Sequence, residues 1–253
     1  ETGVAVERIG FFRNGRMENG MQVTFHPLPD AVPGNYTIGY FPKGPMPDEE
    51  QLSALRQIGK KHNAIFIKME PNIAQKVGKP SAHDQIISFL TDNGAEPGKP
   101  MFTKHTFQLD LTQSEEKIFS NLKSKTRYNV RQAYKAGVQI IEDSSREGLE
   151  TYLQILDETT KRQGFYAHDR AYFENMWKSL QDTDVMRIFH AGYDDTVLVS
   201  WIMFVYNRTL YYPYGASRDV HRDVMASNLM MWEMILFGKQ QGCSQFDMWG
   251  SLG

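Results

Sequence analysis

Two segments of alternating apolar and polar residues, 4–12 and 21–26, lie near the start of the chain, with the sequence Arg13-Asn-Gly-Arg16 between them. An Asn-Gly pair between two such segments is the strongest short-range signal of a tight hairpin turn. This part of the chain is therefore predicted to form a β-hairpin.

The remaining apolar pattern predicts a mixture of strands and helices. Further strands are expected at 36–41, 64–70, 102–111, 138–142, 186–193, 197–206, 209–214 and 244–249, and helices at 49–61, 83–93, 115–136, 145–164, 169–180 and 227–241. The strand at 64–70 is expected to be buried because of its apolar content. Asp48 can cap the first helix, and Thr112-Gln-Ser-Glu115 fits a capping box for the third. Met230, Met231, Trp232 and Met234 are expected in the core.

The order of these elements suggests two related α/β units without a repeat at the level of residues. The boundary is expected near Lys104, which gives one domain at 1–104 and a second at 105–253. In the second, an antiparallel meander leads into a βαβ step, as in N-acetyltransferases. The predicted fold class is therefore mixed α/β, with two tandem acyl-CoA N-acyltransferase-like (GNAT-like) domains. The fold analogy alone does not identify the chemistry.

Composition narrows the class of protein. The chain has 253 residues, 41% of them hydrophobic, a net charge of −2 and one cysteine, Cys243. A single cysteine excludes an internal disulfide and a multi-cysteine zinc site, so a cytoplasmic protein is the simplest interpretation. No apolar run approaches the length of a membrane span, and no signal peptide is recognised. The net charge argues against a general coat on nucleic acid, but not against a local phosphate-binding patch.

Such a patch is suggested by a row of cations in the helix expected at 115–136. Lys123, Arg127, Arg131 and Lys135 follow one another at four-residue spacing, and Lys125 lies beside them. Like charges at this spacing repel, at a total cost on the order of 1 kcal/mol for three pairs. This cationic ladder is either a solvated helix face or one wall of a groove for a nucleic-acid backbone or another polyanion.

Motifs for common catalytic and cofactor-binding sites are missing. The seven histidines do not have metal-ligand spacing, and neither a nucleophile elbow nor a phosphate-binding glycine loop occurs. Cys243 is expected to be a buried structural thiol. The connection at 214–225, where the acetyltransferase fold places its coenzyme A loop, is long and charged and has one glycine. This difference argues against an acetyl-CoA enzyme.

Carboxylates and tyrosines remain as candidate site residues. Glu70 and Asp247 each lie near the end of a predicted strand, a common place for site residues in open α/β sheets. Alternatively, they are edge carboxylates that pair with Lys68 or Arg218. Tyr212 and Tyr214 are two residues apart on one strand, so strict alternation predicts that they share a face. Tyrosines on one face can line a polar cleft or be simply half-buried.

Several of these stretches resemble one family closely. The segment Lys125-Thr-Arg-Tyr-Asn-Val-Arg-Gln-Ala-Tyr-Lys-Ala-Gly137 is similar to the helix that opens the second domain of the Fem-type (FemABX) peptidoglycan aminoacyltransferases. Tyr214-Gly-Ala-Ser217, Ala226-Ser-Asn-Leu-Met-Met-Trp232 and Phe246-Asp-Met-Trp-Gly250 resemble the late strand–helix–strand signature of that family. Phe41-Pro-Lys-Gly-Pro45 and Ile67-Lys-Met-Glu-Pro71 resemble landmarks of its first domain.

The resemblance implies two acetyltransferase-like domains that work without coenzyme A, a metal or another cofactor. The implied reaction transfers an amino acid from aminoacyl-tRNA to an amine of a peptidoglycan stem peptide, on a nucleotide-linked (UDP-linked) or lipid-linked muropeptide precursor. A lipid-linked acceptor would bring the protein to the periphery of a membrane.

The resemblance also assigns roles to individual residues. The implied catalytic residues are Glu70, which orients or deprotonates the amine, and the tyrosine pair Tyr212 and Tyr214 beside it. The implied substrate-binding residues are Lys68, His168, Tyr172, Ser217 and Asp247. His168 falls where some members have an arginine that binds the acceptor's phosphate, and a histidine there would bind in a pH-dependent way. Lys123, Lys125, Arg127, Arg131 and Lys135 are expected to face the tRNA.

Two departures from the family pattern concern the ends of the chain. Family members have a Trp-rich segment before the hairpin, and they continue beyond the Asp-x-Trp-Gly element into a Phe-Lys segment. The chain is therefore expected to be truncated at both ends. Two other hypotheses stay open: an acyl-CoA-dependent N-acyltransferase of the same fold, and a non-catalytic module that binds tRNA or another anion.

Overall fold

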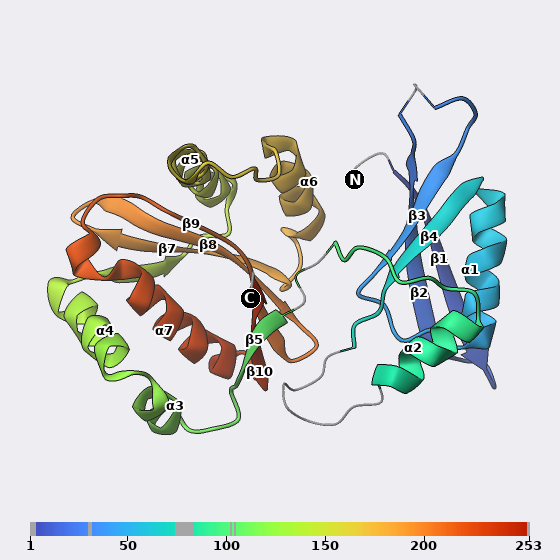
Figure 1. Cartoon of the computed structure of the whole chain (residues 1–253). Coiled ribbons are helices and arrows are strands. Elements are labelled where there is room, and N and C mark those ends of the chain that lie inside the picture. Colours follow the sequence, from blue (N-terminus) through green and yellow to red (C-terminus); the bar gives the residue numbers. More distant parts are fainter. Residues whose placement is uncertain (1–3, 30–31, 74–82, 102, 104, 252–253) are drawn as a thin grey trace. The chain divides into compact units, whose positions relative to one another are not determined.

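The computed structural model describes residues 4–29, 32–73, 83–101, 103 and 105–251 (Figure 1). The chain forms two compact units, residues 2–101 (the first unit) and 102–253 (the second unit). Each unit has a sheet with helices packed on it, so the predicted mixed α+β class is confirmed. Lys104, near which we expected the domain boundary, lies outside the described residues.

The described part of the first unit is a four-stranded sheet with two helices. Its elements are β1 (Ala5–Arg13), β2 (Arg16–Pro27), β3 (Thr37–Pro42), α1 (Glu49–Lys61), β4 (Ala64–Glu70) and α2 (His83–Asp92). The strands follow the order β1-β2-β3-β4, antiparallel except for the parallel pair β3 and β4. Asn14 and Gly15 both have positive φ, at 49° and 75°, which a type I′ hairpin turn requires. The predicted hairpin is confirmed.

Helix α1 supplies the core of the first unit. Asp48 accepts a hydrogen bond from the backbone N–H of Gln51, and the Gln51 side chain accepts one from the backbone N–H of Asp48. This reciprocal pair fixes the start of the helix where the sequence predicted it. Buried side chains of α1 then pack on the sheet: the cluster contains Met21, Val23, Phe25, Phe41, Leu52, Leu55 and Ile58.

The expectation that strand β4 is buried is wrong for two of its apolar residues. Ile65 and Phe66 are 58% and 52% exposed. Thr37 pairs with Ala64 and Ile38 pairs with Phe66, so Ile65 is the extra residue of a β-bulge and stays outside the ladder. Ile67 faces Gly59 of α1, which puts Phe66 on the uncovered face of this edge strand.

The second unit is larger, and its described strands form a six-stranded sheet. Its elements are β5 (His105–Asp110), α3 (Glu115–Asn121), α4 (Ser124–Ala136), β6 (Gln139–Glu142), α5 (Arg146–Gln163), α6 (Arg170–Leu180), β7 (Met186–Tyr193), β8 (Thr196–Tyr206), β9 (Thr209–Ser217), the 3-10 turn η1 (Arg222–Val224), α7 (Ala226–Gln240) and β10 (Gln245–Ser251). The strand order is β5-β10-β9-β8-β7-β6. Only β9 and β10, which α7 connects, are parallel among these described pairs.

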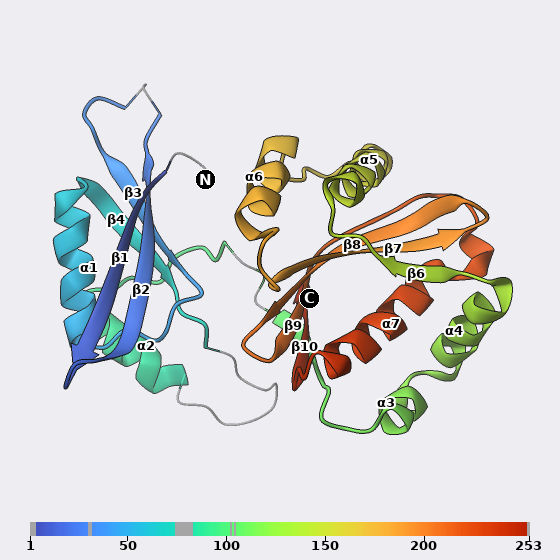
Figure 2. The ribbon, with the colours of Figure 1, turned by 180° about the vertical axis from the view of Figure 1, so that it is seen from behind.

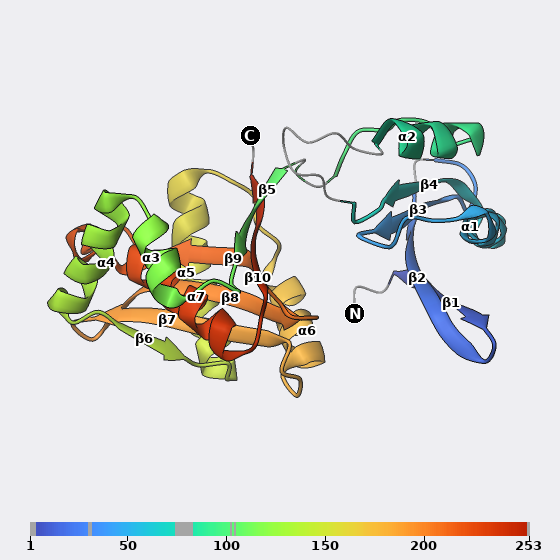
Figure 3. The same ribbon diagram turned by 90° about the horizontal axis from the view of Figure 1, so that it is seen from below.

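Helices cover both faces of this sheet and create two separate cores. Helices α5 and α6 lie on one face and α3, α4 and α7 on the other (Figure 2). In the view from below, α4 and α7 cross the same face (Figure 3). The α5/α6 face buries Tyr152, Ile155, Phe173, Ile188 and Ile202, among others. The α4/α7 face buries a larger cluster, which includes Val130, Leu229, Met230, Trp232, Met234, Cys243 and Phe246. The sequence predicted burial for Met230, Trp232, Met234 and Cys243 among these, and Met231, also expected in the core, is partly buried against the cluster.

The single helix expected at 115–136 is two helices. Leu122 has φ −64° and ψ 149°, an extended conformation that ends α3 before α4 begins at Ser124. The expected capping box at Thr112 is also wrong, because the Thr112 hydroxyl donates to Asp110 at 2.6 Å. Ser114 caps α3 instead and accepts from the backbone N–H of Lys117. Within the described residues, no helix is both long and apolar enough to cross a membrane.

Candidate functional site

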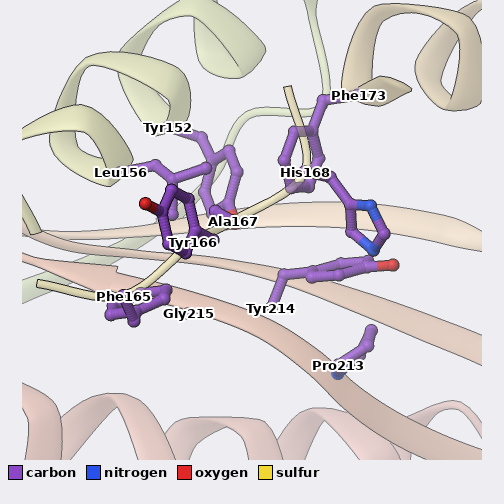
Figure 4. Close-up of a pocket in the computed structure, with 10 residues that line it drawn as sticks. All are labelled: Tyr152, Leu156, Phe165, Tyr166, Ala167, His168, Phe173, Pro213, Tyr214 and Gly215. Carbon is purple, nitrogen blue, oxygen red and sulfur yellow. The ribbon is translucent and has the colours of Figure 1, made fainter. Parts of the chain in front are cut away.

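A pocket of about 360 Å³ opens on the α5/α6 face of the second unit, between the α5–α6 loop and β9 (Figure 4). Its size is within the range of small-molecule sites. Aromatic side chains dominate its wall. The lining residues are Tyr152, Leu156, Phe165, Tyr166, Ala167, His168, Phe173, Pro213, Tyr214 and Gly215.

Two phenols meet at the edge of this pocket. The hydroxyl oxygens of Tyr172, on α6, and Tyr214, on β9, lie 2.7 Å apart. Burial raises the pKa of Tyr214, and the hydrogen bond with Tyr172 raises it further, so its phenol is protonated at neutral pH. The mutual hydrogen bond uses only one of the two hydroxyl hydrogens. The pair therefore keeps one hydrogen that it can donate to a ligand.

His168 forms the outer part of this arrangement. Its ring stacks on Tyr172 with centroids 3.9 Å apart. The same ring lies edge-on to Tyr214 (Figure 4). Asp169 fixes this geometry because it caps α6 and accepts from the backbone N–H of Tyr172 at 2.8 Å. The structure therefore brings together three of the predicted site residues: His168, Tyr172 and Tyr214.

Tyr152 is a pocket residue that the sequence analysis missed. It is only 1% exposed, yet its side chain lines the pocket from α5. Burial raises the pKa of its phenol, with smaller contributions from Tyr214 and Tyr212. Its position repeats the apolar spacing of Leu149 and Leu156 on α5, so the pattern alone indicates a core residue.

Tyr212 does not share a face with Tyr214, contrary to the prediction from strict alternation. Tyr214 pairs with Ile202 and Tyr211 with Phe204, so two residues of β9 lie opposite one residue of β8. This β-bulge at Pro213 changes the direction of the side chains along β9. Tyr212 consequently packs in the α4/α7 core, and Tyr214 packs in the α5/α6 core.

The side chain of Tyr212 is closely packed. Its ring stacks on Trp201 with centroids 4.0 Å apart, and burial raises the pKa of its phenol. A Cβ atom added at Gly215 would lie 2.0 Å from the Tyr212 hydroxyl oxygen. Only a glycine at position 215 leaves room for the phenol in this place.

A second, smaller pocket of about 210 Å³ lies on the other side of Gly215. Phe165 and Gly215 line both pockets, so the two are neighbours. Tyr212 contributes to the second pocket and Tyr214 to the first. The other residues that line the second pocket are Thr159, Gln163, Trp201, Ala216, Ser217 and Ser227.

Ser217 lines this second pocket at the end of β9. Its carbonyl oxygen accepts from the Thr159 hydroxyl at 2.9 Å and from the Arg162 guanidinium at 2.8 Å. Its own hydroxyl lies 3.5 Å from the same guanidinium. Helix α5 thereby anchors the end of β9 beside the pocket.

Asp247 lines neither of the two pockets. It accepts hydrogen bonds from the Thr106 hydroxyl at 2.6 Å, the Trp249 backbone N–H at 2.8 Å and the Gln108 amide at 3.1 Å. These contacts join β10 to β5. The alternative in which Asp247 pairs with Arg218 is wrong, because Arg218 pairs with Glu158 at 3.1 Å.

Glu70 and Lys68 belong to the first unit. Glu70 accepts from the Tyr40 hydroxyl at 2.6 Å and from the backbone N–H of Met101 at 2.6 Å. Burial, and then the bond to Glu70, raise the pKa of Tyr40, which therefore stays a donor at neutral pH. The Lys68 ammonium donates to the Lys99 carbonyl. The carboxylate of Glu70 is thus held from two sides.

The cations of the ladder have different surroundings. The Arg127 guanidinium donates to the carbonyl oxygens of Ser120, at 2.9 Å, and Leu122, at the end of α3. Arg131 lies over the ring of Phe119, 5.3 Å from its centroid. Lys123, Lys125 and Lys135 are exposed, and no carboxylate among the described residues pairs with them.

The described residues contain no group of three or more His, Cys, Asp or Glu side chains that could hold a metal ion.

Charged side chains of the connection from β9 to α7 form ion pairs. Arg218 pairs with Glu158 across to α5, and Arg222 pairs with Asp219.

Comparison with known proteins identifies the family of this chain. Residues 1–188 match the FemAB family. The chain belongs to the FemAB family. The resemblance to Fem-type transferases in the sequence is thereby confirmed.

Related proteins extend this FemAB assignment. Lipid II:glycine glycyltransferase of Staphylococcus aureus is 27% identical over an alignment of 206 positions that covers 76% of this chain and 47% of that protein. The chain therefore spans about half the length of the curated relatives it matches. The crystal structure of FemX matches 99% of this chain and 80% of its own with a TM-score of 0.83 at 20% identity.

A tandem GNAT protein from the clavulanic acid biosynthesis pathway matches 97% of this chain and 74% of its own, with a TM-score of 0.56 at 11% identity. At such low identity the two structural likenesses show the fold alone. They confirm the tandem GNAT-like architecture of this FemAB-family chain.

Proposed function

We propose that this protein is an aminoacyltransferase of cell-wall cross-bridge synthesis. It transfers an amino acid from aminoacyl-tRNA to an amine of a peptidoglycan precursor's stem peptide. Membership of the FemAB family and the similarity to a lipid II:glycine glycyltransferase support this function. The observation that carries it is the phenol pair of Tyr172 and Tyr214 at the edge of the pocket.

The reaction is the aminolysis of an ester. The amine nitrogen attacks the ester carbonyl, a C–N bond forms, the C–O bond to the tRNA ribose breaks, and a proton passes from the amine to the ribose oxygen. A negative charge develops on the carbonyl oxygen in between. The free hydroxyl hydrogen of the Tyr172–Tyr214 pair is a preorganised donor for this oxygen, and such donors are among the largest contributions to catalysis.

The proton must leave the attacking amine, and a phenol that remains protonated cannot accept it. We assign this role to Glu70, whose carboxylate is only an acceptor when ionised. Tyr40 and the Met101 N–H hold it in one orientation. Lys68, two residues earlier on β4, is proposed to contact the acceptor.

The remaining site residues divide between the two substrates. His168 is exposed and stacked on Tyr172, which suits a contact with a phosphate of the acceptor. Ser217 faces the second pocket and is proposed as a substrate contact there. Tyr212 is proposed to shape that pocket. Asp247 is assigned to the pairing of β5 with β10 rather than to substrate.

The cationic ladder and the name of the S. aureus relative point to the two partners. Lys123, Lys125 and Lys135, with the ladder's two arginines, are proposed to contact the tRNA. A lipid-linked precursor is proposed as the acceptor, with the UDP-linked form as the alternative. Because aminoacyl-tRNA is a cytoplasmic molecule, the reaction would take place in the cytoplasm at the periphery of the membrane.

A transfer assay, together with a measurement of tRNA binding, separates this function from the alternatives. The protein is incubated with glycyl-tRNA, or another aminoacyl-tRNA, and either the lipid-linked or the UDP-linked precursor, and the product is detected by mass spectrometry. Parallel reactions contain uncharged tRNA with free amino acid, or acetyl-CoA. Transfer only from charged tRNA is expected. Transfer from acetyl-CoA alone would establish the acyl-CoA alternative, and tRNA binding without any transfer would establish the non-catalytic one.

A further inference from the structure

Tyr152 places a buried phenol in the wall of the pocket on the α5/α6 face. The residue is only 1% exposed, yet it lines the pocket together with Phe173 and Tyr214 (Figure 4). None of the described residues forms a hydrogen bond with its hydroxyl group. A buried tyrosine usually has a partner for this group. The Tyr152 hydroxyl is therefore open to a partner that the described fold does not supply.

This hydroxyl reaches the space of the pocket. Within the described part of the chain, the unpartnered side-chain atoms that are fully enclosed belong to Arg187, His190 and Ser200, and the Tyr152 oxygen is not one of them. The small exposed part of Tyr152 therefore includes its hydroxyl, and the cavity that this side chain lines is the pocket.

Packing alone does not require a tyrosine at position 152. Its ring lies edge-on to Phe173 with centroids 5.4 Å apart, and a phenylalanine ring would make the same contact. The hydroxyl adds a desolvation cost that no described hydrogen bond offsets. Such a cost is typical of a group that serves a ligand rather than the fold.

The walls around this hydroxyl are aromatic, and none of the residues that line the pocket is acidic. The ring planes of Tyr152 and Tyr214 are inclined to that of Phe173 by 60° and 81°, so the three rings face different directions. Phe165 and Tyr166 add two more rings from the α5–α6 loop. Because the faces of such rings attract cations, the pocket suits a small cationic group.

We propose that this pocket binds the aminoacyl residue of the donor, with its α-ammonium group among the aromatic rings and hydrogen-bonded to the Tyr152 hydroxyl oxygen. This inference rests on the proposed function. It assigns the interior of the pocket to the donor and makes Tyr152 a residue that binds the group to be transferred.

The proposed place of the ester determines which group comes to Tyr152. Its carbonyl oxygen is proposed to lie at the phenol pair of Tyr172 and Tyr214, and one ring, that of Phe173, lies between Tyr214 and Tyr152. The α-amino group is the only other polar group that all aminoacyl residues share. The aminoacyl residue is also the end of the donor, so it can enter a pocket while the tRNA extends outward.

The protonation state of Tyr152 agrees with this contact. Burial raises the pKa of its phenol, and the nearby phenol of Tyr214 raises it further. A neutral phenol keeps lone pairs that accept a hydrogen bond from an ammonium group. A hydrogen bond to a charged group is also stronger than one between neutral groups. An uncharged acyl group, such as acetyl, would make neither this bond nor the contact with the ring faces.

The binding test uses a stable analogue of the donor's end, 3′-deoxyadenosine that carries glycine through a 3′-amide, and isothermal titration calorimetry. Tyr152→Phe should weaken binding about tenfold, because one hydrogen bond to a charged group is lost. An N-acetylglycyl analogue has no ammonium group. It should bind the parent at least about tenfold more weakly than the glycyl analogue, and Tyr152→Phe should not weaken its binding further.

Stability separates a ligand-binding role from a structural one. Without ligand, Tyr152→Phe should keep or raise the midpoint of urea denaturation, because it removes a buried hydroxyl that has no described partner. The matched control is Tyr134→Phe, which removes the same atom from a phenol that donates to Glu233. This control should lower the midpoint and bind the glycyl analogue like the parent.

Two results would overturn the inference. One is equal affinity of the parent and Tyr152→Phe for the glycyl analogue. The other is equal affinity of the parent for the glycyl and N-acetylglycyl analogues. Because the analogue cannot react, the test is independent of catalysis. If transfer from charged tRNA fails while binding depends on Tyr152, the proposed function fails and this inference stands. If transfer succeeds while binding does not depend on Tyr152, only this inference fails.

Discussion

Strand β9 presents two tyrosines, two residues apart, to opposite faces of the same sheet. On the α5/α6 face, Tyr214 borders an open pocket and shares a hydrogen bond with Tyr172. On the α4/α7 face, Tyr212 stacks on Trp201 and its hydroxyl fills the space above Gly215. The phenols have the same chemistry, but Tyr212 is the more deeply buried. Tyr214 belongs to a hydrogen-bonded pair that keeps one hydrogen to donate, whereas Tyr212 is packed against Trp201 and Gly215.

The α5/α6 face also tolerates buried polar groups. His190 on β7 pairs in register with Ser200 on β8, and both point toward this face with Ile188 and Ile202. Both are buried, and neither side chain has a hydrogen-bond partner within the described residues. Polar groups that are buried without partners cost free energy. The unpartnered His190 and Ser200 therefore lower the stability of the pocket face.

The largest effect is expected from removing the phenol hydroxyl on the pocket face. Tyr214→Phe should lower kcat about 100-fold, because it removes an oxyanion donor, with little change in KM. Tyr212→Phe is the matched control, since it makes the same change on the same strand. It should keep kcat within a few-fold of the parent. Equal losses in both variants, measured by single-turnover transfer from aminoacyl-tRNA, would remove the functional distinction between the two faces.

The next effect concerns stability on the Tyr212 face. Gly215→Ala places a methyl group where the Tyr212 hydroxyl lies, and the stacked Trp201 limits how far the ring can move. We expect a loss of about 1–3 kcal/mol in the free energy of unfolding. Gly192→Ala is the control, because a Cβ there comes no closer than 3.9 Å to any neighbouring atom. Urea denaturation of both variants measures the difference, and equal midpoints would show that position 215 is not crowded.

The buried histidine on the pocket face makes stability depend on pH. Burial lowers the pKa of His190, and the nearby Asp143 opposes this only in part. Below pH ~6.5 the unfolded chain binds a proton that the folded protein does not. The free energy of unfolding is therefore fully retained above that pH and should fall by at most about 1.4 kcal/mol per pH unit below it.

His190→Leu tests this dependence without requiring activity. The loss of stability between pH 6.5 and 5.5 should be smaller in the variant than in the parent. Hydrogen bonds from Ser145 lower the pKa of the nearby Asp143, so this carboxylate contributes little in this window. If the free energy of unfolding, measured by urea denaturation, falls equally with pH in parent and variant, other groups cause the pH dependence.

The periodicity of the sequence was sufficient to predict most helices and strands. It was not sufficient to predict in which direction the side chains point at the site. The hairpin turn at Asn14 and Gly15, and helix α1 after Asp48, lie where they were predicted because local turn and cap chemistry determines them. The faces of Tyr212 and Tyr214 depend instead on a β-bulge, which arises from pairing with β8. A pairing between distant segments leaves no periodic signal in either segment alone.

The same limitation explains two other differences. The exposure of Ile65 and Phe66 follows from another bulge, in the pairing of β3 with β4. Tyr152 lies at a spacing typical of a core residue, and only the loop at 165–168 makes it part of a pocket. His168, Tyr172 and Tyr214, by contrast, were identified through the family resemblance, and the structure brings them together.

The smallest effect is expected in the cationic ladder. There too, a structural group can be compared with a group that is proposed to face a ligand. The Arg127 guanidinium satisfies carbonyl oxygens at the end of α3, so Arg127→Ala should lower the free energy of unfolding by about 1 kcal/mol. Lys135→Ala should leave stability unchanged, because no described carboxylate pairs with Lys135. RNA affinity should show the reverse order, with the larger loss in Lys135→Ala. Measuring both quantities in both variants separates the two roles, and a ladder that acts only as a uniform cationic surface would lose RNA affinity equally at both positions.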